Sequence, residues 1–180
     1  VYLAEAREWL DSDGDGVGDN ADAFPNDASE TIDSDGDGVG DNGDAFPTDA
    51  AASVDSDGDG SPNSWNAGKT VADSTTGLTL DVYPADATEW LDSDGDGVGD
   101  NADAFPNDIA ASVDSDGDGY PDSWNGGYSE ADSTTGLMLD ALPAESSEWL
   151  DSDGDGVGDN ADAFPNDASE TIDSDGDGIG

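Results

Sequence analysis

The 180-residue sequence contains neither cysteine nor histidine. Without cysteine the chain has no disulfide framework, no thiolate zinc cluster and no thiol nucleophile. Without histidine it lacks a common transition-metal ligand and the usual general base. A metal bound by this chain must therefore be held by oxygen atoms, which favours a hard cation such as calcium.

Positive charge is also almost absent. Two basic residues, Arg7 and Lys69, stand against 47 acidic ones, and the formal charge is −45. Low hydrophobicity combined with high net charge is typical of intrinsic disorder, because such a chain buries too little apolar surface to offset the entropy lost on folding. A compact fold of this charge would require neutralisation by cations. No run approaches the roughly 20 apolar residues of a membrane span, so we expect no membrane insertion.

The acidic residues nevertheless recur at fixed positions, which disorder does not require. The hexapeptide Asp-Ser-Asp-Gly-Asp-Gly occurs seven times, at spacings of 22 or 37 residues that combine into a 59-residue super-repeat. The copies begin at Asp11, Asp33, Asp55, Asp92, Asp114, Asp151 and Asp173. We interpret residues 1–180 as one continuous repeat array. Both ends fall inside repeats, so we expect the array to belong to a longer chain.

Each hexapeptide opens a loop with the ligand spacing of a calcium site. Carboxylates at loop positions 1, 3 and 5 converge when the chain curls tightly, and the glycine at position 6 permits the turn that brings in the carbonyl of position 7. An acid at position 12 completes the set of oxygens, and one at position 9 binds directly or through water. Asp-Gly pairs also form ordinary turns. Turn formation alone does not explain why acids recur at positions 9 and 12.

The candidate ligands follow from this spacing. Four loops have the complete set: Asp11, Asp13, Asp15, Val17, Asp19 and Asp22; Asp33, Asp35, Asp37, Val39, Asp41 and Asp44; Asp92, Asp94, Asp96, Val98, Asp100 and Asp103; Asp151, Asp153, Asp155, Val157, Asp159 and Asp162. The loops that open the 37-residue units end in asparagine: Asp55, Asp57, Asp59, Ser61, Asn63 and Asn66; Asp114, Asp116, Asp118, Tyr120, Asp122 and Asn125. The last loop offers Asp173, Asp175, Asp177 and Ile179. Because Asn66 and Asn125 replace a charged ligand, we expect their sites to fill last.

Short elements are expected between the loops. Asp27 stands three residues before Glu30, the spacing of a helix capping box, which predicts a single helical turn. The longer units carry inserts at about residues 61–81 and 120–140, where turn residues precede a short apolar run. These inserts predict small extended or hairpin-like excursions.

Three known calcium-repeat architectures do not fit this period. Paired EF-hands need a helix on each side of the loop, and a 22-residue unit leaves only ten residues outside a loop of twelve, with a proline among them. Dockerin modules run from the loop straight into an amphipathic helix, whereas here the loop is followed by Ala23-Phe24-Pro25. Parallel rolls of the RTX type need a nine-residue glycine-rich period, which is missing.

The sequence resembles the thrombospondin type 3 repeat over nearly its whole length. The matching string is Asp33-Ser-Asp-Gly-Asp-Gly-Val-Gly-Asp-Asn-Gly-Asp-Ala-Phe-Pro47, repeated with small changes in each short unit. The resemblance implies an irregular, elongated array wrapped around a string of calcium ions, with ligands at positions 1, 3, 5, 7, 9 and 12. It also implies that each motif helps to bind more than one ion, with about 7–14 calcium ions for the seven motifs. Acids such as Asp27 and Asp49 are then candidates for ions shared between loops.

One departure from the family concerns its cysteines. Animal members carry two cysteines near the proline, at positions held here by Ala21 and Phe24. The equivalents of Phe24 are Phe46, Phe105 and Phe164. The chain therefore resembles a cysteine-free variant of the bacterial type, in which an aromatic staple replaces the disulfide. We expect each phenylalanine to pack against the apolar residue before a loop, such as Ile32 or Val54.

Tryptophan recurs at fixed repeat positions, which favours packing in the repeat cores. Stacking on sugars or partner chains is the alternative. The five residues are Trp9, Trp65, Trp90, Trp124 and Trp149.

These features predict a calcium-rigidified stalk, spacer or fibre of a secreted or surface protein, such as an adhesin or a filament subunit. Extracellular calcium modules have dissociation constants of about 10⁻⁴ to 10⁻³ M, so such sites fill outside the cell. The expected partners are calcium and, as candidates, other copies of the chain or neighbouring domains. The alternative is a flexible calcium buffer or mineral-binding polyanion. A nucleic-acid mimic is disfavoured because calcium would neutralise it. We expect no enzyme, because the carboxylates occur in identical sets without a distinct pocket.

Overall fold

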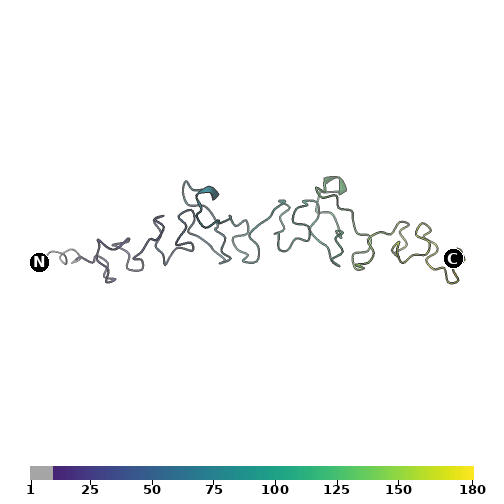
Figure 1. Ribbon diagram of the computed structural model, residues 1–180, viewed down its shortest axis with the longest axis horizontal. Helices are drawn as coiled ribbons and strands as arrows, with labels where there is room; N and C mark the ends of the chain where they lie inside the picture. The colour runs from purple at the N-terminus through teal and green to yellow at the C-terminus, as the bar shows by residue number, and fades with distance from the viewer. Residues whose placement is uncertain (1–9) are drawn as a thin grey trace. The chain divides into compact units, whose positions relative to one another are not determined.

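A computed structural model describes residues 10–180 (Figure 1), so Arg7 and Trp9 lie outside the described residues. In the described part, the only helices are two 3-10 turns, η1 (Val71–Asp73) and η2 (Glu130–Asp132), and there is no β-strand. The prediction of an irregular fold with little secondary structure is confirmed. Within residues 10–180, no helix has the length and apolar character that crossing a membrane requires.

The chain divides into two compact units, Val1–Leu91 and Asp92–Gly180. The boundary falls immediately before a hexapeptide, so it separates repeats instead of cutting one. Each unit contains one insert, and each insert carries one of the two helical turns, drawn in blue and green in Figure 1. The same hydrogen bonds recur at equivalent positions in the two units, so one description serves both.

Each hexapeptide is curled by hydrogen bonds from its own backbone. In the first copy, the Asp11 carboxylate accepts from the N–H groups of Gly14 at 2.7 Å and Gly16 at 3.1 Å. The same pair of bonds occurs in all seven copies. Gly14 and Gly16 have φ angles of +84° and +98°, a region that residues with a Cβ rarely adopt. The Asp-x-x-Gly-x-Gly pattern therefore sets the shape of the loop.

The segment between loops is a turn, and the predicted helical turn at Asp27 is wrong. The Glu30 N–H donates to the Asp27 carbonyl at 2.9 Å, and Asp27 Oδ1 accepts from both the N–H and the hydroxyl of Ser29. Instead of reaching back to complete a capping box, the Glu30 carboxylate reaches forward and accepts the N–H of Asn42 at 3.0 Å. The glutamate is used to join two repeats, so no helix is capped there.

This glutamate also explains why glycine stands at position 8 of the short loops. A Cβ placed on Gly40 would overlap the Glu30 carboxylate, and Glu148 covers Gly158 in the same way. Before the long units the glutamate is replaced by alanine and the glycine by proline. These four residues, Ala52 with Pro62 and Ala111 with Pro121, are buried. The junctions are thus of two kinds: in one a glutamate lies over glycine, and in the other buried alanine and proline occupy the two positions.

The apolar residue before each loop does not form the predicted core. Ile32 and Val54 are 57% and 51% exposed, so they do not bury their side chains against a phenylalanine. Their contribution comes from the backbone, because the Ile32 carbonyl accepts from the N–H of loop position 9 at 2.9 Å. The fully buried apolar side chains of the described residues are alanines and prolines: Ala51, Ala52, Ala110, Ala111, Pro62 and Pro121. Such small side chains fit where successive loops leave little space between their backbones.

Each insert leaves and rejoins the array at a closed base. The Asp81 N–H donates to the Pro62 carbonyl at 3.0 Å, which brings the two ends of the first insert together. Of the two predicted forms, extended or hairpin-like, a paired hairpin is not formed, since no strand occurs among the described residues of the insert. The insert instead folds back on Asp49, whose Oδ2 accepts from the hydroxyls of Ser74 at 2.7 Å and Thr76 at 2.6 Å.

Asp49 is therefore an anchor for the insert, and the expectation that it shares an ion is corrected. Its Oδ2 also accepts the N–H groups of Thr75 and Thr76, and only 1% of the residue is exposed. Burial alone would raise the pKa of this carboxyl, but the hydrogen bonds from Thr76 and Ser74 outweigh burial and hold the pKa well below its usual range. Asp108 holds the second insert through Ser133 and Thr135 in the same way. These oxygens have their partners without a cation.

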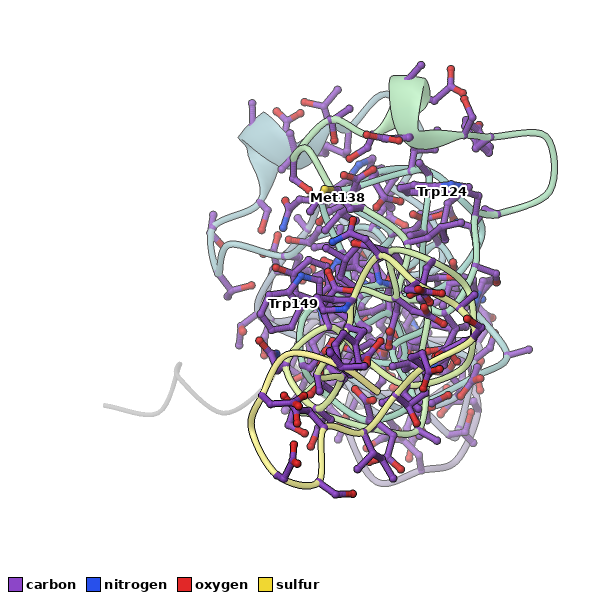
Figure 2. The ribbon with its side chains drawn as sticks, turned by 90° about the vertical axis from the view of Figure 1, so that its right-hand side faces the viewer. Trp124, Met138 and Trp149 are labelled. Atoms are coloured by element: carbon purple, nitrogen blue, oxygen red, sulfur yellow. The ribbon has the colours of Figure 1, made fainter. Side chains whose placement is uncertain are left out.

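The four described tryptophans, Trp65, Trp90, Trp124 and Trp149, are not fully buried. Trp149 stacks in parallel on Tyr120, with ring centroids 4.9 Å apart, whereas Trp90 is 40% exposed. Trp124 and Trp149 are labelled in Figure 2. Met138, on the second insert, is 49% exposed. The expectation of tryptophan packing inside the repeats is met at Trp149 and not at Trp90.

The Glu30–Gly40 contact predicts a coupled pair of mutations. Gly40 does not have a positive φ, so alanine is conformationally acceptable there and its cost comes from displacing the Glu30 carboxylate. Gly40→Ala should lower the free energy of unfolding by about 1–3 kcal/mol at saturating calcium, as measured by guanidinium denaturation. In a Glu30→Ala background the same change should cost nothing or stabilise slightly. Equal costs in both backgrounds would contradict the contact.

Candidate metal sites

The carboxylates at loop positions 1, 3 and 5 come together in each hexapeptide. In the first loop, one oxygen each from Asp11, Asp13 and Asp15 lies within 4.8 Å of the others. Equivalent triads form at Asp33–Asp37, Asp55–Asp59, Asp92–Asp96 and Asp114–Asp118, with two more groups in the described residues. The predicted convergence of positions 1, 3 and 5 is therefore present. These acidic groups have the arrangement of a metal site.

Backbone N–H groups orient the carboxylates at positions 3 and 5. Asp13 Oδ1 accepts the N–H of Asp15 at 3.3 Å, and Asp15 Oδ1 accepts the N–H of Val17 at 2.7 Å. The same bonds recur in all seven loops. The N–H that orients position 5 belongs to position 7, whose carbonyl was predicted to join the ligands. Each of these carboxylates keeps its second oxygen for another partner.

Most of those second oxygens, together with one oxygen of four further aspartates, are buried and have no hydrogen-bond partner. The set comprises Asp13, Asp15, Asp35, Asp44, Asp57, Asp59, Asp81, Asp94, Asp116, Asp118, Asp140, Asp153, Asp155 and Asp162. An unpaired carboxylate oxygen removed from water is costly, and several of them side by side repel one another. With no basic residue in the loops, a bound cation is the partner that suits them. The donor set is made of oxygen alone, which fits a hard cation.

The predicted closing acids at position 12 face the triads. Asp44 is 8% exposed; its Oδ1 accepts the N–H of Phe46 at 2.7 Å, and its Oδ2 is unpartnered. Burial raises its pKa, and the negative charges of Asp37 and Asp35 raise it further. In the second unit, burial and the charges of neighbouring aspartates raise the pKa of Asp103 to about 6. Position 12 is thus part of a crowded group of carboxylates.

In the two long units the closing acid comes after the insert, which the sequence reasoning missed. Asp81 and Asp140 are each 6% exposed, and each has one unpartnered, buried Oδ2. The N–H of Tyr83 orients Asp81 at 2.7 Å, as Phe46 orients Asp44. Burial raises the pKa of Asp81, and the charges of Asp59 and its loop neighbours raise it further. Asp81 therefore occupies the place in its loop that was assigned to Asn66.

A signal for this assignment was present in the sequence. Every closing acid stands three residues before a proline, with an aromatic residue or leucine between them, as in Asp22-Ala-Phe-Pro25. The same pattern reads Asp81-Val-Tyr-Pro84 and Asp140-Ala-Leu-Pro143 in the long units. Counting backwards from the proline finds the acid, whereas counting forwards from the hexapeptide enters the insert.

Asn66 and Asn125 lie against a different loop from the one in which they were predicted. The Asn66 Nδ2 donates to Asp37 Oδ2 at 2.6 Å, and the Asn125 Nδ2 donates to Asp96 Oδ2 at 2.5 Å. Both partners belong to the preceding short loop. The expectation that the sites of the long units fill last assumed a missing charged ligand, and Asp81 and Asp140 supply that ligand.

The position 9 carboxylates clamp the serine at position 2. Asp19 Oδ1 accepts the Ser12 N–H and its Oδ2 accepts the Ser12 hydroxyl, both at 2.8 Å. Asp41, Asp100, Asp122 and Asp159 make the same pair of bonds. At Asn63 the amide oxygen accepts the Ser56 N–H and the amide nitrogen donates to the hydroxyl. Direct metal binding by position 9 would have to use the remaining lone pairs of these oxygens.

The last loop repeats the backbone pattern with more exposed acids. Asp173 accepts from Gly176 and Gly178 as in the other copies. Asp175 and Asp177 are exposed, and Ile179 is 74% exposed.

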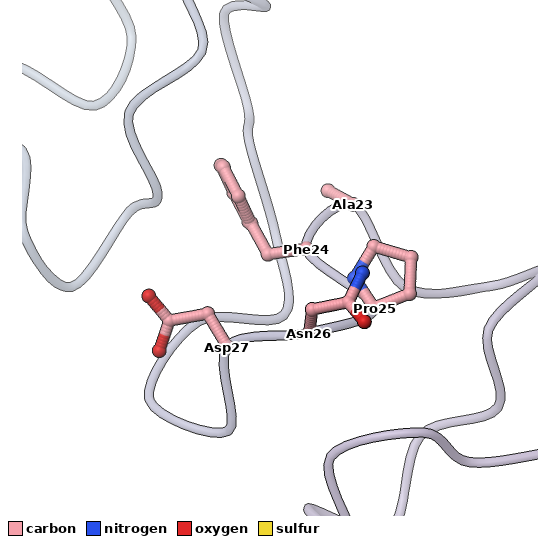
Figure 3. Close-up of a pocket in the computed structure, with 5 residues that line it drawn as sticks. All are labelled: Ala23, Phe24, Pro25, Asn26 and Asp27. Atoms are coloured by element: carbon pink, nitrogen blue, oxygen red, sulfur yellow. The ribbon is translucent and has the colours of Figure 1, made fainter.

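Shallow hollows lie beside the phenylalanine of some short units. The residues from Ala23 to Asp27 line one of about 290 Å³ (Figure 3), and those from Ala163 to Asp167 line another of about 310 Å³. Beside Phe105 the hollow shrinks to about 140 Å³, because Thr135 of the insert closes it. None of these hollows collects unpartnered carboxylate oxygens, so the metal sites are separate from them.

No protein-family model matches this chain, and the comparison with curated proteins finds no significant match. The interpretation of the sites therefore rests on their geometry.

The role of Asp81 can be tested with a neutral isostere. Asp81→Asn keeps the shape but removes a charged ligand, so it should weaken calcium binding by the Asp55 loop by about 10–100-fold. Calcium titration followed through the amide NMR signal of Gly60, which donates to Asp55, reports on this loop. Asp86→Asn is the matched control, because Asp86 is exposed and bonded to Thr88. An unchanged Gly60 titration in Asp81→Asn would exclude Asp81 from the site.

Proposed function

We propose that this chain is a calcium-binding structural region whose fold is held by the bound ions. The observation that carries the proposal is the set of buried, unpartnered carboxylate oxygens that recurs in successive loops. Backbone N–H groups orient these carboxylates and leave their second oxygens available to a cation. Because these sites offer only oxygen ligands, they suit a hard cation better than a metal that prefers nitrogen or sulfur ligands.

Calcium suits the loops better than magnesium. Calcium accepts six to eight oxygen ligands in flexible geometry, whereas magnesium requires near-ideal octahedral geometry and keeps several waters. Each loop offers three convergent carboxylates, a closing acid and the carbonyl of position 7. Carboxylates that bind through both oxygens raise the number of ligands further, towards the coordination that calcium favours.

Ion binding also supplies the missing positive charge. Two divalent ions for each of the seven motifs would add 28 charges and bring the formal charge from −45 to about −17. One ion per motif gives about 7 ions in total and two give about 14. Because a loop without its ion is a cluster of repelling carboxylates, we propose that binding and folding occur together.

The proposed architecture is a tandem array of thrombospondin type 3-like repeats. The 22-residue period, the Asp33–Pro47 string and the irregular fold support it. The tryptophan-containing inserts are an addition to that pattern, and they leave the array within a loop, between positions 9 and 12.

We further propose that the array serves as a stalk, spacer or fibre of a secreted or surface protein. Millimolar extracellular calcium would fill sites with dissociation constants of about 10⁻⁴ to 10⁻³ M, while cytosolic calcium would leave them empty. A rigid array of repeats is suited to holding an adhesive domain away from a surface or to building a filament. Its partners in this proposal are calcium and adjoining domains or further copies of the chain.

Calcium removal tests the proposal. On addition of a chelator, the near-ultraviolet circular dichroism of the stacked Tyr120–Trp149 pair should vanish. Small-angle scattering should then give a radius of gyration of about 45 Å, the value for an unfolded chain of this length. Readdition of calcium should restore both signals, and equimolar magnesium should not.

Limited proteolysis in calcium separates this proposal from a flexible polyanion. A calcium-rigidified array should be protected within the loops, whereas a flexible calcium buffer would be cut throughout. Order and shape that persist unchanged after complete chelation would refute metal-held folding.

A further inference from the structure

Each long repeat places one asparagine against the loop of the short repeat before it. Asn66 belongs to the repeat that begins at Asp55, yet its Nδ2 donates to Asp37 Oδ2 at 2.6 Å, 29 positions earlier. In the second unit, the Asn125 Nδ2 donates to Asp96 Oδ2 at 2.5 Å. The contact therefore occurs once in each unit, always from a long repeat to the short loop before it.

The other bonds of the Asn66 amide fix which end faces the loop. Its Nδ2 also donates to the Ala50 carbonyl at 3.5 Å, and its Oδ1 accepts the Ser53 hydroxyl at 2.8 Å. Its backbone N–H donates to the carbonyl of Ala51, which is fully buried. A carboxylate and a carbonyl both need a donor, so the amide presents its nitrogen to the loop. Asn66 therefore meets Asp37 as a hydrogen-bond donor held by the buried segment between the two loops.

This donor makes position 5 of two loops different from the rest. The Asp37 Oδ1 accepts the Val39 N–H at 2.7 Å and its Oδ2 accepts from Asn66, so both oxygens are held. In four other loops the second oxygen of position 5 is buried without a partner: Asp15, Asp59, Asp118 and Asp155. Rotation of the Asp37 carboxylate is therefore more restricted than rotation of those four.

A neutral donor suits this place better than an acid. The second oxygens of Asp35 and Asp44 are already buried and unpartnered in the same loop. A further carboxylate beside Asp37 would add repulsion, whereas an amide N–H meets its oxygen without adding negative charge. This accounts for asparagine at position 12 of the long repeats, whose closing acid comes later in the chain.

We propose that Asn66 and Asn125 are positioning residues for the preceding loops, which begin at Asp33 and Asp92. Each holds the carboxylate of position 5 in the orientation that meets a divalent cation, and neither binds the cation itself. An ionised carboxylate has about two lone pairs on each oxygen, so the oxygen that accepts Nδ2 keeps one for the cation. The inference rests on the proposed calcium binding, and it makes the affinity of a short loop depend on the long repeat that follows.

Per-loop calcium titration of the whole 180-residue chain, followed by amide NMR, tests the assignment. The N–H groups of Gly16, Gly38 and Gly60 donate to the first carboxylates of three successive loops. In Asn66→Ala, the Asp37 carboxylate has to be ordered by the cation, so the calcium concentration at half-change should rise about 3–10-fold at Gly38. Gly16 and Gly60 should be unaffected. Asn26→Ala, at an exposed site, is the matched control and should change none of them.

A second signal separates positioning from unfolding of the insert. The Thr76 N–H donates to Asp49, so its chemical shift at saturating calcium reports whether the insert is docked. Positioning leaves the Thr76 shift of Asn66→Ala as in the wild type. If that shift changes, Ser53→Ala decides, because it loosens the Asn66 amide from outside the insert. A smaller rise at Gly38 with Thr76 unchanged then supports positioning, and no rise at Gly38 overturns it.

Asn66→Asp distinguishes a donor from a ligand. Aspartate cannot donate to Asp37 and adds a negative charge beside it, so the calcium concentration at half-change for Gly38 should rise at least as much as in Asn66→Ala. Binding as tight as in the wild type, or tighter, would make residue 66 a ligand and overturn the assignment.

Three other results have separate meanings. An unchanged Gly38 in Asn66→Ala shows that the donor does not matter, and tighter binding there shows that the amide competes with the cation; either result overturns positioning. Wild-type chain in which Gly16, Gly38 and Gly60 all fail to respond to calcium refutes the proposed function itself, before any variant is considered.

Discussion

Repulsion between carboxylates is the constraint on which the rest of this structure depends. Each hexapeptide brings three acidic side chains together, and the hexapeptides contain no basic side chain to separate them. Backbone N–H groups satisfy one oxygen of most of these carboxylates and leave the other buried and unpaired. Hydrogen bonds within the chain therefore position the acids without neutralising them. In the proposed function, a cation that met the free oxygens would relieve the repulsion and stabilise the same geometry.

The packing between loops is correspondingly modest. Alanine and proline are the buried apolar residues of the described chain, and the larger Ile32 and Val54 are half exposed. Small side chains allow successive loops to approach closely, but they bury too little area to drive folding by the hydrophobic effect. These small side chains set the spacing between loops. Where a short loop follows, the glutamate that lies over glycine contributes to the same spacing.

The inserts show how such a loop accepts fifteen additional residues. They enter after position 9 and leave before the closing acid, and the Asp81–Pro62 hydrogen bond joins their two ends. The cost of closing a longer loop grows slowly with its length, so an insertion with a closed base is tolerated. The buried Asp49 then recovers part of that cost by binding the hydroxyls of the insert. An acid that resembled a shared metal ligand in the sequence became the anchor of a segment absent from the short repeats.

Much of this protein was decided by the sequence alone. The absence of cysteine and histidine, the charge of −45 and the recurring Asp-Ser-Asp-Gly-Asp-Gly motif predicted oxygen-based metal sites in an irregular chain. The irregular fold and the convergence of positions 1, 3 and 5 are confirmed, because these positions are close in the chain and bonds between neighbouring residues bring them together. Contacts across long distances in sequence were decided by the tertiary structure. Asp81 closes the loop that begins 26 residues earlier, at Asp55. Asn66 was assigned to that loop by counting positions, but it contacts Asp37 of the preceding loop. Spacing within one loop does not carry that information, because the path of the insert determines which side chain arrives at the site.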